Sequence, residues 1–316
     1  MPKVSVIMPA YNAGQYIAAA IESLLTQSFG DFELLIINDS STDNTESVII
    51  EYSKRDARVV LLQNARGKGI VGALNTGLKE ARGKYIARAD ADDLNHPDRF
   101  RLQVDYLDSH PDIFLLGTGV EFFDDTGYLF NMAHPSSSVE IAWRFVSRIT
   151  YCHGTLMCRR AVFEALGEYQ KAEIEDFKYF SRAARRFRGS NLPQVLYKYR
   201  QWPKSRMFTF NEEIYRNHFE VALDNIRYYL GDDAIAEAFY RYQYQHQLHW
   251  RDLIKIMKAN RRILARIFAD YGMSAHAREA RRLRLVVARS YPEAIVWHNF
   301  SAVRPIYRKL KHYLRF

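Results

Sequence analysis

Short apolar runs and amphipathic stretches alternate along the first hundred residues. The apolar runs are rich in Val, Ile and Leu, which is typical of strands covered on both faces. The stretches between them repeat apolar residues at three- and four-residue intervals, which predicts helices. Predicted strands cover residues 4–8, 32–37, 58–62 and 85–89, and predicted helices cover residues 13–26, 48–52 and 70–81. This alternation predicts an α/β fold, Rossmann-like, with a mostly parallel sheet flanked by helices.

The pattern changes after Pro97. A predicted helix over residues 98–109 leads to an apolar strand over 113–120, and a mixed pattern follows up to residue 200. Residues 211–290 then have the period of helices. Strands followed by helices indicate two parts, so we expect a first domain over residues 1–205 and a helical C-terminal region over 206–316.

Polar residues follow three of the predicted strands at the point where each strand ends. The first strand leads to Pro9-Ala-Tyr-Asn12, the second to Asn38-Asp39-Ser40-Ser41, and the fourth to Asp90-Ala-Asp-Asp93. The carboxyl ends of parallel strands meet at one edge of a sheet, where open α/β folds bind ligands. We therefore expect a ligand site on this edge.

Three carboxylates lie within four positions at the end of the fourth strand. Side chains two residues apart on a strand point the same way, so we expect Asp90 and Asp92 to project together and Asp93 to turn aside. Crowded carboxylates repel unless a cation lies between them, and Mg²⁺ or Mn²⁺ prefers oxygen ligands. The cluster predicts a divalent metal; the alternative is a solvated turn with a helix cap before Pro97.

The stretch Gly67-Lys-Gly-Ile-Val-Gly72 matches the G-x-G-x-x-G pattern of dinucleotide-binding proteins. An NAD-type oxidoreductase is therefore an alternative, although the match follows the third strand and not the first. The other interpretations are a flexible loop at a helix start, or a mobile loop on which Arg66 and Lys68 face phosphate. Asp39 would accept a hydrogen bond from a base or ribose, or form an Asx-turn or helix cap.

Acids precede aromatic residues in the segment Glu173-Ile-Glu-Asp-Phe177. A carboxylate partly desolvated by aromatic neighbours has a raised pKa and serves as a general base. The alternative is a helix N-terminus at which acids favour the macrodipole. His153 is interpreted either as a satisfied turn histidine or as a contact near a reacting group.

The formal net charge is +9 at pH 7, and residues 278–316 alone supply +8 of it. Within this part, residues 304–316 place basic residues around apolar ones at helical spacing, without an acid. Such a helix either rests on an anionic membrane surface or packs on the protein body with a solvated basic face. A basic nucleic-acid-binding protein is the competing non-enzyme interpretation. No nucleic-acid motif supports it, and we expect no nucleic-acid partner.

Cysteine usage and hydropathy indicate the compartment. Cys152 and Cys158 are too few for a disulfide framework, and their spacing fits no common zinc pattern. No secretory signal is visible, and no apolar run approaches the roughly 20 residues of a membrane span. We expect a cytoplasmic protein, with peripheral contact to the inner face of the plasma membrane as an open alternative.

Six segments together resemble the family 2 glycosyltransferases, which have the GT-A fold. They are VSVIMPAYN (4–12), LLIINDSSTDNT (34–45), GALNTGLKEARGKYIARADADD (72–93), PDR (97–99), HGTLMCRRAVFEALGEY (153–169) and IEDFKYFSRAARRF (174–187). The resemblance implies transfer of a sugar from a nucleotide-sugar, with UDP as the expected nucleotide, to an acceptor hydroxyl with inversion. Synthesis of a bacterial cell-surface polysaccharide, lipopolysaccharide or capsule is the expected setting.

The resemblance implies a role for each matching residue. Asp92 would ligate the metal on the donor diphosphate, and Asp176, with Glu175 beside it, would be the catalytic base. Asp93 and His153 would contact the acceptor or support the site. The implied nucleotide-sugar-binding residues are Pro9, Tyr11, Asn12, Asp39, Arg66, Asp90 and Ala91.

The chain departs from the processive branch of this family. The Gln-x-x-Arg-Trp element of processive synthases is absent, and Tyr199-Arg-Gln-Trp202 does not match it. A single-addition enzyme is therefore expected, with a saccharide or a lipid-linked saccharide as its acceptor.

Overall fold

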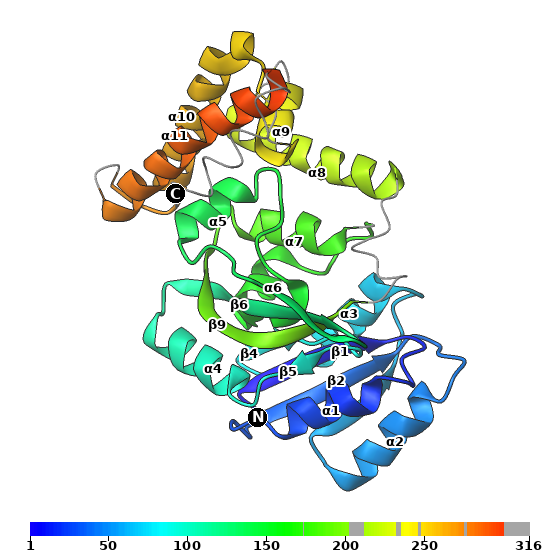
Figure 1. Ribbon diagram of the computed structural model, residues 1–316. Coiled ribbons are helices and arrows are strands. Elements are labelled where there is room, and N and C mark those ends of the chain that lie inside the picture. Colours follow the sequence, from blue (N-terminus) through cyan, green and yellow to red (C-terminus); the bar gives the residue numbers. More distant parts are fainter. Residues whose placement is uncertain (173, 202–211, 232–234, 246–247, 275–276, 300–316) are drawn as a thin grey trace.

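The computed structural model describes residues 1–316 apart from 173, 202–211, 232–234, 246–247, 275–276 and 300–316 (Figure 1). Its strands are β1 (Val4–Ala10), β2 (Phe32–Asn38), β3 (Val59–Gln63), β4 (Tyr85–Arg88), β5 (Leu94–Asn95), β6 (Ile113–Asp124), β7 (Gly127–Met132), β8 (Met157–Arg159) and β9 (Arg188–Arg200). Its helices are α1 (Ile17–Leu25), α2 (Thr45–Arg55), α3 (Ile70–Glu80), α4 (Arg99–Ser109), α5 (Ser138–Arg144), α6 (Arg160–Leu166), α7 (Glu175–Ala183), α8 (Glu212–Leu230), α9 (Ala236–Gln245), α10 (Leu253–Asp270) and α11 (Arg278–Asn299), with 3-10 turns η1 (His153–Thr155) and η2 (Trp250–Asp252).

The described strands form a nine-stranded sheet in the order β3-β2-β1-β4-β8-β6-β9-β5, with β7 paired to β6. The first four strands run parallel, as the strand–helix alternation predicted. β8 enters antiparallel between β4 and β6, and β6 and β9 run parallel to each other. The chain order reverses between β1 and β4. The carboxyl ends of these two strands therefore border the crevice in which open α/β sheets bind ligands.

Both faces of the parallel strands are buried. Val4, Val6 and Met8 of β1 belong to a core that also contains residues of α1 and α4, whereas Ile7 belongs to the core on the α3 side. The two-residue period of a strand produces this division. On α3, a Cβ atom added to Gly77 would lie 2.6 Å from Cγ2 of Ile7, so this glycine allows the helix to approach the sheet closely.

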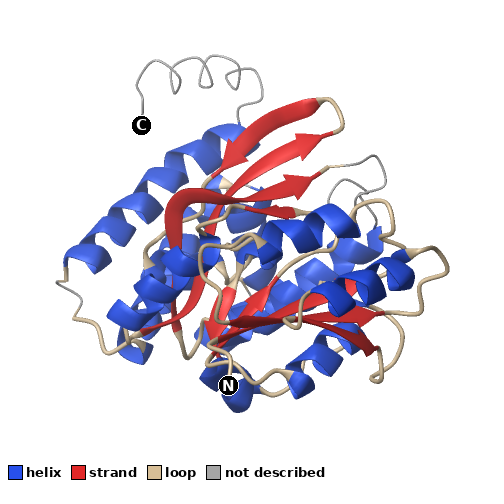
Figure 2. Cartoon of the chain, turned by 90° about the horizontal axis from the view of Figure 1, so that it is seen from below, coloured by secondary structure: helices blue, strands red, loops and turns tan. Residues whose placement is uncertain are grey.

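The C-terminal helices pack against α5 and α7. Ile226 of α8 and Ile263 of α10 share one core cluster with Trp143 of α5 and Phe177 of α7. Trp143 also donates a hydrogen bond from Nε1 to Oδ1 of Asn260 at 2.8 Å. Figure 1 places this helical layer at the opposite end of the molecule from α1 and α2. Figure 2, a view from below, shows that helices lie on both sides of the sheet.

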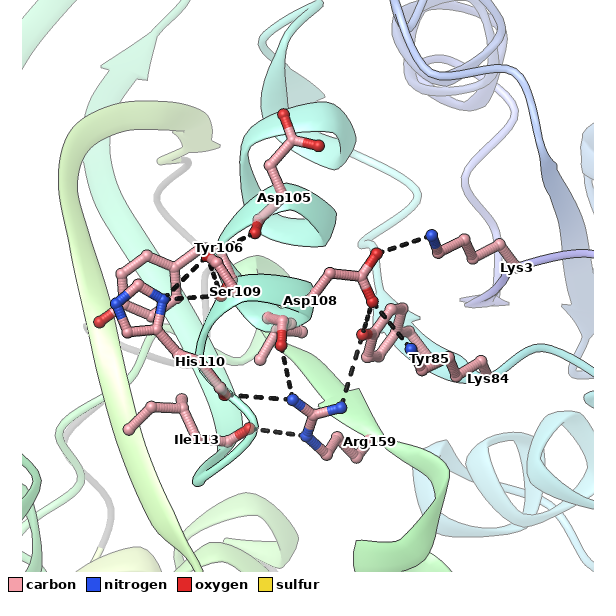
Figure 3. Close-up of polar contacts among 11 residues, drawn as sticks. Lys3, Lys84, Tyr85, Asp105, Tyr106, Asp108, Ser109, His110, Ile113 and Arg159 are labelled. Carbon is pink, nitrogen blue, oxygen red and sulfur yellow. Dashed lines mark hydrogen bonds and ion pairs between the residues drawn. The ribbon is translucent and has the colours of Figure 1, made fainter.

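The carboxylate of Asp108 ties the end of α4 to the starts of β1 and β4 (Figure 3). Lys3 lies 2.7 Å away, and Lys84 and Tyr85 donate hydrogen bonds at 2.8 and 2.6 Å. These donors hold the pKa of Asp108 well below its usual range. Arg159 of β8 adds hydrogen bonds to main-chain carbonyls at the end of α4. The elements α4, β1, β4 and β8 therefore meet at the amino ends of β1 and β4.

The predicted α/β class, with a mostly parallel sheet and helices on both faces, is confirmed. The antiparallel entry of β8 was not predicted, because residues 121–200 had no clear period. The division at residues 205/206 stays a prediction, because it falls within 202–211, outside the described residues.

Candidate active site

The carboxyl ends of β1, β2 and β4 bring the expected polar residues to one rim of the sheet. Ala10 at the end of β1 is in register with Asn38 at the end of β2. The main-chain N–H of Asp39 donates to the carbonyl of Ala10 at 2.9 Å. β4 lies on the other side of β1 and leads directly to Asp90. The expected convergence at this rim follows from the parallel register.

Asn12 joins the loop after β1 to the loop after β2. Its Oδ1 accepts a hydrogen bond from the main-chain N–H of Thr42 at 2.8 Å, and its own N–H donates to Oγ of Ser41 at 3.1 Å. Asn12 and Ser40 both have positive φ angles, of 47° and 60°. Non-glycine residues hold such conformations where their surroundings impose them, often next to a binding site.

Asp39 points toward the loop that follows β3. Its carboxylate accepts hydrogen bonds from Nδ2 of Asn64 at 2.6 Å and from the N–H of Gly69 at 2.8 Å. The side chain is buried. The alternative of a helix cap is not observed, because Asp43 accepts the hydrogen bond from Thr45 at the start of α2. Asp39 therefore links the ends of β2 and β3.

The glycine-rich match shapes this loop. Gly67 and Gly69 have φ angles of 93° and 109°, conformations that glycine adopts without strain. A Cβ atom on Gly72 would lie 1.7 Å from the carbonyl oxygen of Gly67. β3 is at the edge of the sheet, away from the reversal point at which dinucleotides bind. The conformation of this loop therefore accounts for the three glycines of the G-x-G-x-x-G match.

The same loop carries two basic residues with different contacts. Arg66 pairs with Oε1 of Glu168 at 3.0 Å. The ammonium group of Lys68 lies 5.5 Å from the centre of the Tyr11 ring, which is 51% exposed. An exposed ring next to an ammonium group offers a stacking face and charge neutralisation at one place.

Asp90 forms an ion pair with the buried Arg88. Nη2 of Arg88 lies 2.6 Å from Oδ1 of Asp90, and their side chains are 6% and 28% exposed. The hydroxyl of Tyr197 on β9 donates to the other carboxylate oxygen at 3.3 Å. A Cβ atom on Gly154 would lie 2.7 Å from that same oxygen, so the site requires glycine there.

Asp92 and Asp93 have different surroundings. β4 ends at Arg88, before the acids, and Asp92 lies in a turn. Asp93 is buried, and its Oδ1 accepts a hydrogen bond from the N–H of Arg200 at 2.7 Å. Burial, reinforced by the charges of Asp90 and Asp92, raises the pKa of Asp93 well above its usual range. Arg200 also donates from Nε to the carbonyl of Asp92 at 3.1 Å, which holds the turn in place.

The acidic turn carries oxygen donors of the type that a divalent cation prefers. Within the described part of the chain, no group of three or more His, Cys, Asp or Glu side chains is arranged to hold a metal. Mg²⁺ commonly needs only one or two carboxylates, because substrate phosphates and water complete its ligands. Asp92 and Oδ2 of Asp93, which has no hydrogen-bond partner among the described residues, are oxygen donors of the required type.

Asp176 stands in the first turn of α7, where its Oδ1 accepts a hydrogen bond from the N–H of Phe177 at 2.7 Å. Burial raises its pKa, the charge of Asp90 raises it further, and the charge of Arg88 lowers it. This direction is the one that the sequence predicted for a partly desolvated carboxylate. Sensitivity to Asp90 and Arg88 places Asp176 in the electrostatic neighbourhood of the acidic turn.

His153 bridges the neighbourhood of Asp176 and the aromatic core. Its Nε2 lies 3.2 Å from the hydroxyl of Tyr169, and its Nδ1 lies 3.8 Å from Oε1 of the buried Glu175. Burial and the charge of Arg88 lower the pKa of His153 well below its usual range, so the ring is neutral. The contact with Tyr169 is within hydrogen-bond distance, and the role of His153 stays a prediction.

The candidate residues thus form two groups around the end of β1. The first group lies on the loops after β1, β2 and β3 and consists of Tyr11, Asn12, Asp39 and Arg66, with Pro9 in β1 itself. Asp90, Asp92, Asp93, His153, Glu175 and Asp176 lie near β4, η1 and α7, with Ala91 buried in the acidic turn.

Comparison with known proteins decides the family. The family model described as glycosyl transferase family 2 matches residues 5–167, about half of the chain. The chain belongs to glycosyl transferase family 2. The match includes the rim residues from Pro9 to Asp93 and His153, and it ends before the first turn of α7.

Relatives of this glycosyltransferase include two bacterial proteins. The putative glycosyltransferase EpsE of Bacillus subtilis is 37% identical over 219 residues, which are 66% of this chain and 78% of EpsE. The UDP-Glc:alpha-D-GlcNAc-diphosphoundecaprenol beta-1,3-glucosyltransferase WfgD of Escherichia coli is 41% identical over 114 residues, 36% of this chain and 44% of WfgD.

Solved structures of two other glycosyltransferases share the fold. S. aureus TarS 1–349 in complex with UDP-GlcNAc has a TM-score of 0.56 and 20% identity, covering 97% of this chain and 92% of that chain. The mannosyltransferase PcManGT from Pyrobaculum calidifontis, in complex with GDP-Man and Mn²⁺, has a TM-score of 0.58 and 18% identity, covering 95% and 84%. The expected GT-A fold is confirmed. The oxidoreductase and nucleic-acid-binding alternatives are not favoured.

Three residues of the candidate site were not predicted from the sequence. Arg88 carried a signal, since a charged residue interrupts an apolar strand. Tyr197 and Arg200 carried none, because they reach the acidic turn from a strand more than a hundred positions away.

Two expectations concern the membrane. The basic segment 304–316 lies outside the described residues. No described helix is long and apolar enough to cross a membrane.

Proposed function

We propose that this glycosyltransferase moves a sugar from a nucleotide-sugar, with UDP as the expected nucleotide, to an acceptor hydroxyl with inversion. The observation that carries the proposal is the electrostatic proximity of the acidic turn to Asp176, a carboxyl with a raised pKa. Direct displacement needs a leaving-group site and a base in one neighbourhood. The bound UDP-GlcNAc and GDP-Man of TarS and PcManGT support the donor class.

The nucleotide would bind across the loops after β1, β2 and β3. The exposed ring of Tyr11 offers a stacking face to the base, framed by Pro9 and Asn12. Asp39 would accept a hydrogen bond from the base or ribose. Arg66, next to Lys68, would offset phosphate charge.

The ribose and diphosphate would lie along the acidic turn. Asp90, held by its ion pair with Arg88, would face the ribose side together with Ala91. Asp92 would hold Mg²⁺ or Mn²⁺ on the diphosphate, with Asp93 in support, and the Mn²⁺ of PcManGT supports this assignment. Such a cation offsets the negative charge that develops on the departing nucleoside diphosphate.

Asp176 would act as the general base. Its carboxylate takes the proton of the acceptor hydroxyl while the hydroxyl oxygen bonds to the anomeric carbon. The bond from that carbon to the diphosphate oxygen breaks on the opposite face, which inverts the configuration. Glu175 and the neutral His153 would position the acceptor or Asp176, since His153 lies 3.8 Å from Glu175.

The acceptor would be a saccharide or a lipid-linked saccharide used for a cell-surface polysaccharide, lipopolysaccharide or capsule. The acceptor named for WfgD is diphosphoundecaprenol-linked, which supports this class. We place the enzyme in the cytoplasm, on the inner face of the plasma membrane, with residues 1–205 catalytic and 206–316 an appended helical region. Equal liposome co-sedimentation with and without residues 304–316 would remove the membrane contact from the proposal.

Asp176→Asn tests the base. We expect loss of at least about a hundredfold in kcat with unchanged donor affinity, because a general base contributes about 10² to 10⁴ in rate. The assay is nucleoside diphosphate release from a panel of nucleotide-sugars with Mn²⁺, and NMR of the product gives its anomeric configuration. Asp105→Asn, at a 66% exposed side chain on α4, is the matched control. Retained transfer in Asp176→Asn would contradict the assignment.

Asp92→Ala tests the metal ligand separately. We expect weaker donor binding only when Mg²⁺ or Mn²⁺ is present, because the side chain acts through the cation. Calorimetric titration with the nucleotide, with and without metal, measures this difference. An equal loss of affinity under both conditions would assign Asp92 a direct role with the nucleotide and remove the metal role.

A further inference from the structure

Tyr197 of β9 reaches the acidic turn (residues 90–93) although it lies 107 positions along the chain from Asp90. The residue is buried, and it is in register with Val120 of β6 and Asn95 of β5. The Cζ atom of Arg99 lies 5.3 Å from the centre of its ring. Strand pairing on both sides and this cation–π contact hold the ring in place. The hydroxyl therefore has a fixed position beside the turn.

The hydroxyl of Tyr197 makes two contacts with a single residue. It accepts a hydrogen bond from the main-chain N–H of Asp90 at 3.2 Å, and it donates to Oδ2 of Asp90 at 3.3 Å. The other carboxylate oxygen, Oδ1, lies 2.6 Å from Nη2 of Arg88. A tyrosine hydroxyl both donates and accepts, whereas a phenylalanine ring does neither. One oxygen atom therefore fixes both the main chain and the carboxylate of Asp90.

These contacts lie where the chain leaves the sheet after β4. The N–H of Ala89 donates to the carbonyl of Ile7 on β1 at 3.2 Å. At the next residue, Asp90, the acceptor of the N–H is the Tyr197 hydroxyl and not a main-chain carbonyl. An N–H without an acceptor is costly away from water. The hydroxyl therefore allows the strand to become the acidic turn at this residue.

Gly154 of η1 leaves the space that the hydroxyl occupies. A Cβ atom added to Gly154 would overlap the hydroxyl oxygen of Tyr197 and would lie 2.7 Å from Oδ2 of Asp90. Three segments distant in the sequence therefore pack closely around one hydroxyl. In such dense packing the position of Asp90 depends on the presence of a single atom.

We propose that Tyr197 is a positioning residue for the nucleotide-sugar donor and that it acts through Asp90. The inference rests on the proposed function, in which Asp90 faces the ribose side of the donor. Asp176, the proposed base, belongs to a different element, α7. Loss of the hydroxyl should therefore weaken donor binding more than it slows the chemical step.

Tyr197→Phe removes the hydroxyl and keeps the ring. With Mn²⁺ and a nucleotide-sugar that the wild type uses, we expect the donor KM to rise about tenfold and kcat to change less than about threefold. The reason is that two hydrogen bonds are lost on the donor side alone. Calorimetric titration with UDP or GDP, whichever binds the wild type, should show a loss of affinity of similar size.

Tyr271→Phe is the matched control. The buried Tyr271 also makes two hydrogen bonds through its hydroxyl, to the carbonyl of Ala184 at 2.6 Å and to that of Phe187 at 3.2 Å. It lies against Arg188, at the opposite end of β9 from the acidic turn. Tyr271→Phe should lower the urea midpoint of unfolding, as Tyr197→Phe does, but should keep the donor KM and nucleotide affinity of the wild type. A general loss of stability is thereby separated from positioning.

A double-mutant cycle tests the contact without any donor. The losses of unfolding free energy in Tyr197→Phe and Asp90→Ala should not add in the combined variant, because both changes remove the same hydrogen bond. Additive losses would overturn the inference. Wild-type KM and nucleotide affinity in folded Tyr197→Phe would also overturn it, and so would an equal rise in KM in Tyr271→Phe. A wild type that binds nucleotide but transfers no sugar would instead contradict the proposed function, and the nucleotide affinities of the variants would still decide the role of Tyr197.

Discussion

Arg88 interrupts the apolar strand β4 and pairs with Asp90 at 2.6 Å. Its charge also lowers the pKa of Asp176, against burial and the charge of Asp90, and it lowers the pKa of His153. One buried guanidinium therefore favours the ionised form of the proposed base and the neutral form of its histidine neighbour. An unpaired guanidinium is costly to bury, so Arg88 and the surrounding carboxylates stabilise one another.

Arg88→Met should move the acid limb of the pH profile. The proposed base must be ionised to accept a proton, so kcat/KM of the wild type should fall as the pH drops through the raised pKa of Asp176. Removing the Arg88 charge raises that pKa further, and the limb should shift to higher pH. The free energy of unfolding should fall by about 2 to 4 kcal/mol, because Asp90 loses its partner. Arg101→Met, at a 44% exposed residue, is the control for both measurements. An acid limb at the same pH in Arg88→Met and the wild type would contradict the electrostatic role of Arg88.

At the scale of elements, α4 is positioned from both of its ends. Arg99 in its first turn is fully buried and donates a hydrogen bond from Nη2 to the carbonyl of Arg88 at 2.8 Å. Asp108 in its last turn binds Lys3, Lys84 and Tyr85 at the starts of β1 and β4 (Figure 3). α4 therefore spans from the amino ends of the strands to the acidic turn.

Asp108→Asn should destabilise the fold and change its acid sensitivity. The folded pKa of Asp108 is depressed, so its contribution to stability is complete above the unfolded pKa of about 3.9 and is lost as the pH falls toward the folded pKa. Because the carboxylate of Asp108 is 34% exposed and Lys84 is 56% exposed, solvent screening limits the loss at pH 7 to about 1 to 2 kcal/mol. Urea unfolding at pH 7 and pH 3 measures it, with Asp105→Asn as the matched control. A loss that is equal at both pH values would contradict the ionic account.

At the scale of the molecule, the C-terminal helices share one core with α5 and α7. His218 of α8 stacks on Phe177 of α7 with ring centroids 4.7 Å apart, and its Nδ1 lies 3.1 Å from the hydroxyl of Tyr240 on α9. Phe177 follows Asp176 directly, so the packing of the C-terminal helices supports the helix that carries the proposed base. Burial lowers the pKa of His218 to about 4.

His218→Phe should make the protein less sensitive to acid. The folded histidine stays neutral, whereas the unfolded one takes a proton below about pH 6.5, so stability is lost as the pH falls from there toward 4. A shift of this size corresponds to at most about 3 kcal/mol. The wild type should lose more of its unfolding free energy than His218→Phe between pH 7 and pH 4.5, with exposed His96→Phe behaving as wild type. Parallel pH curves for all three proteins would contradict this account.

Most of the parallel half of the sheet and its rim were predictable. β1 to β4 contain runs of apolar residues, and the polar residues after β1, β2 and β4 mark the rim at which we propose that the donor binds. The second half was not predictable, because β8 and β9 pair with strands distant in the chain. Tyr197 reaches Asp90, and Arg200 reaches Asp93, across 107 positions. Local periodicity contains no information about such pairings.

The sequence by itself determined the α/β class, the acidic turn and the carboxylates at the start of α7, because each depends on near neighbours along the chain. Only the tertiary structure decided what surrounds them. It buried Arg88 against Asp90, and it set Arg200 against Asp92 and Asp93. These features depend on which strands pair and how deeply each charge is buried. Strand pairing and the burial of charges depend on contacts between residues that are distant in the sequence.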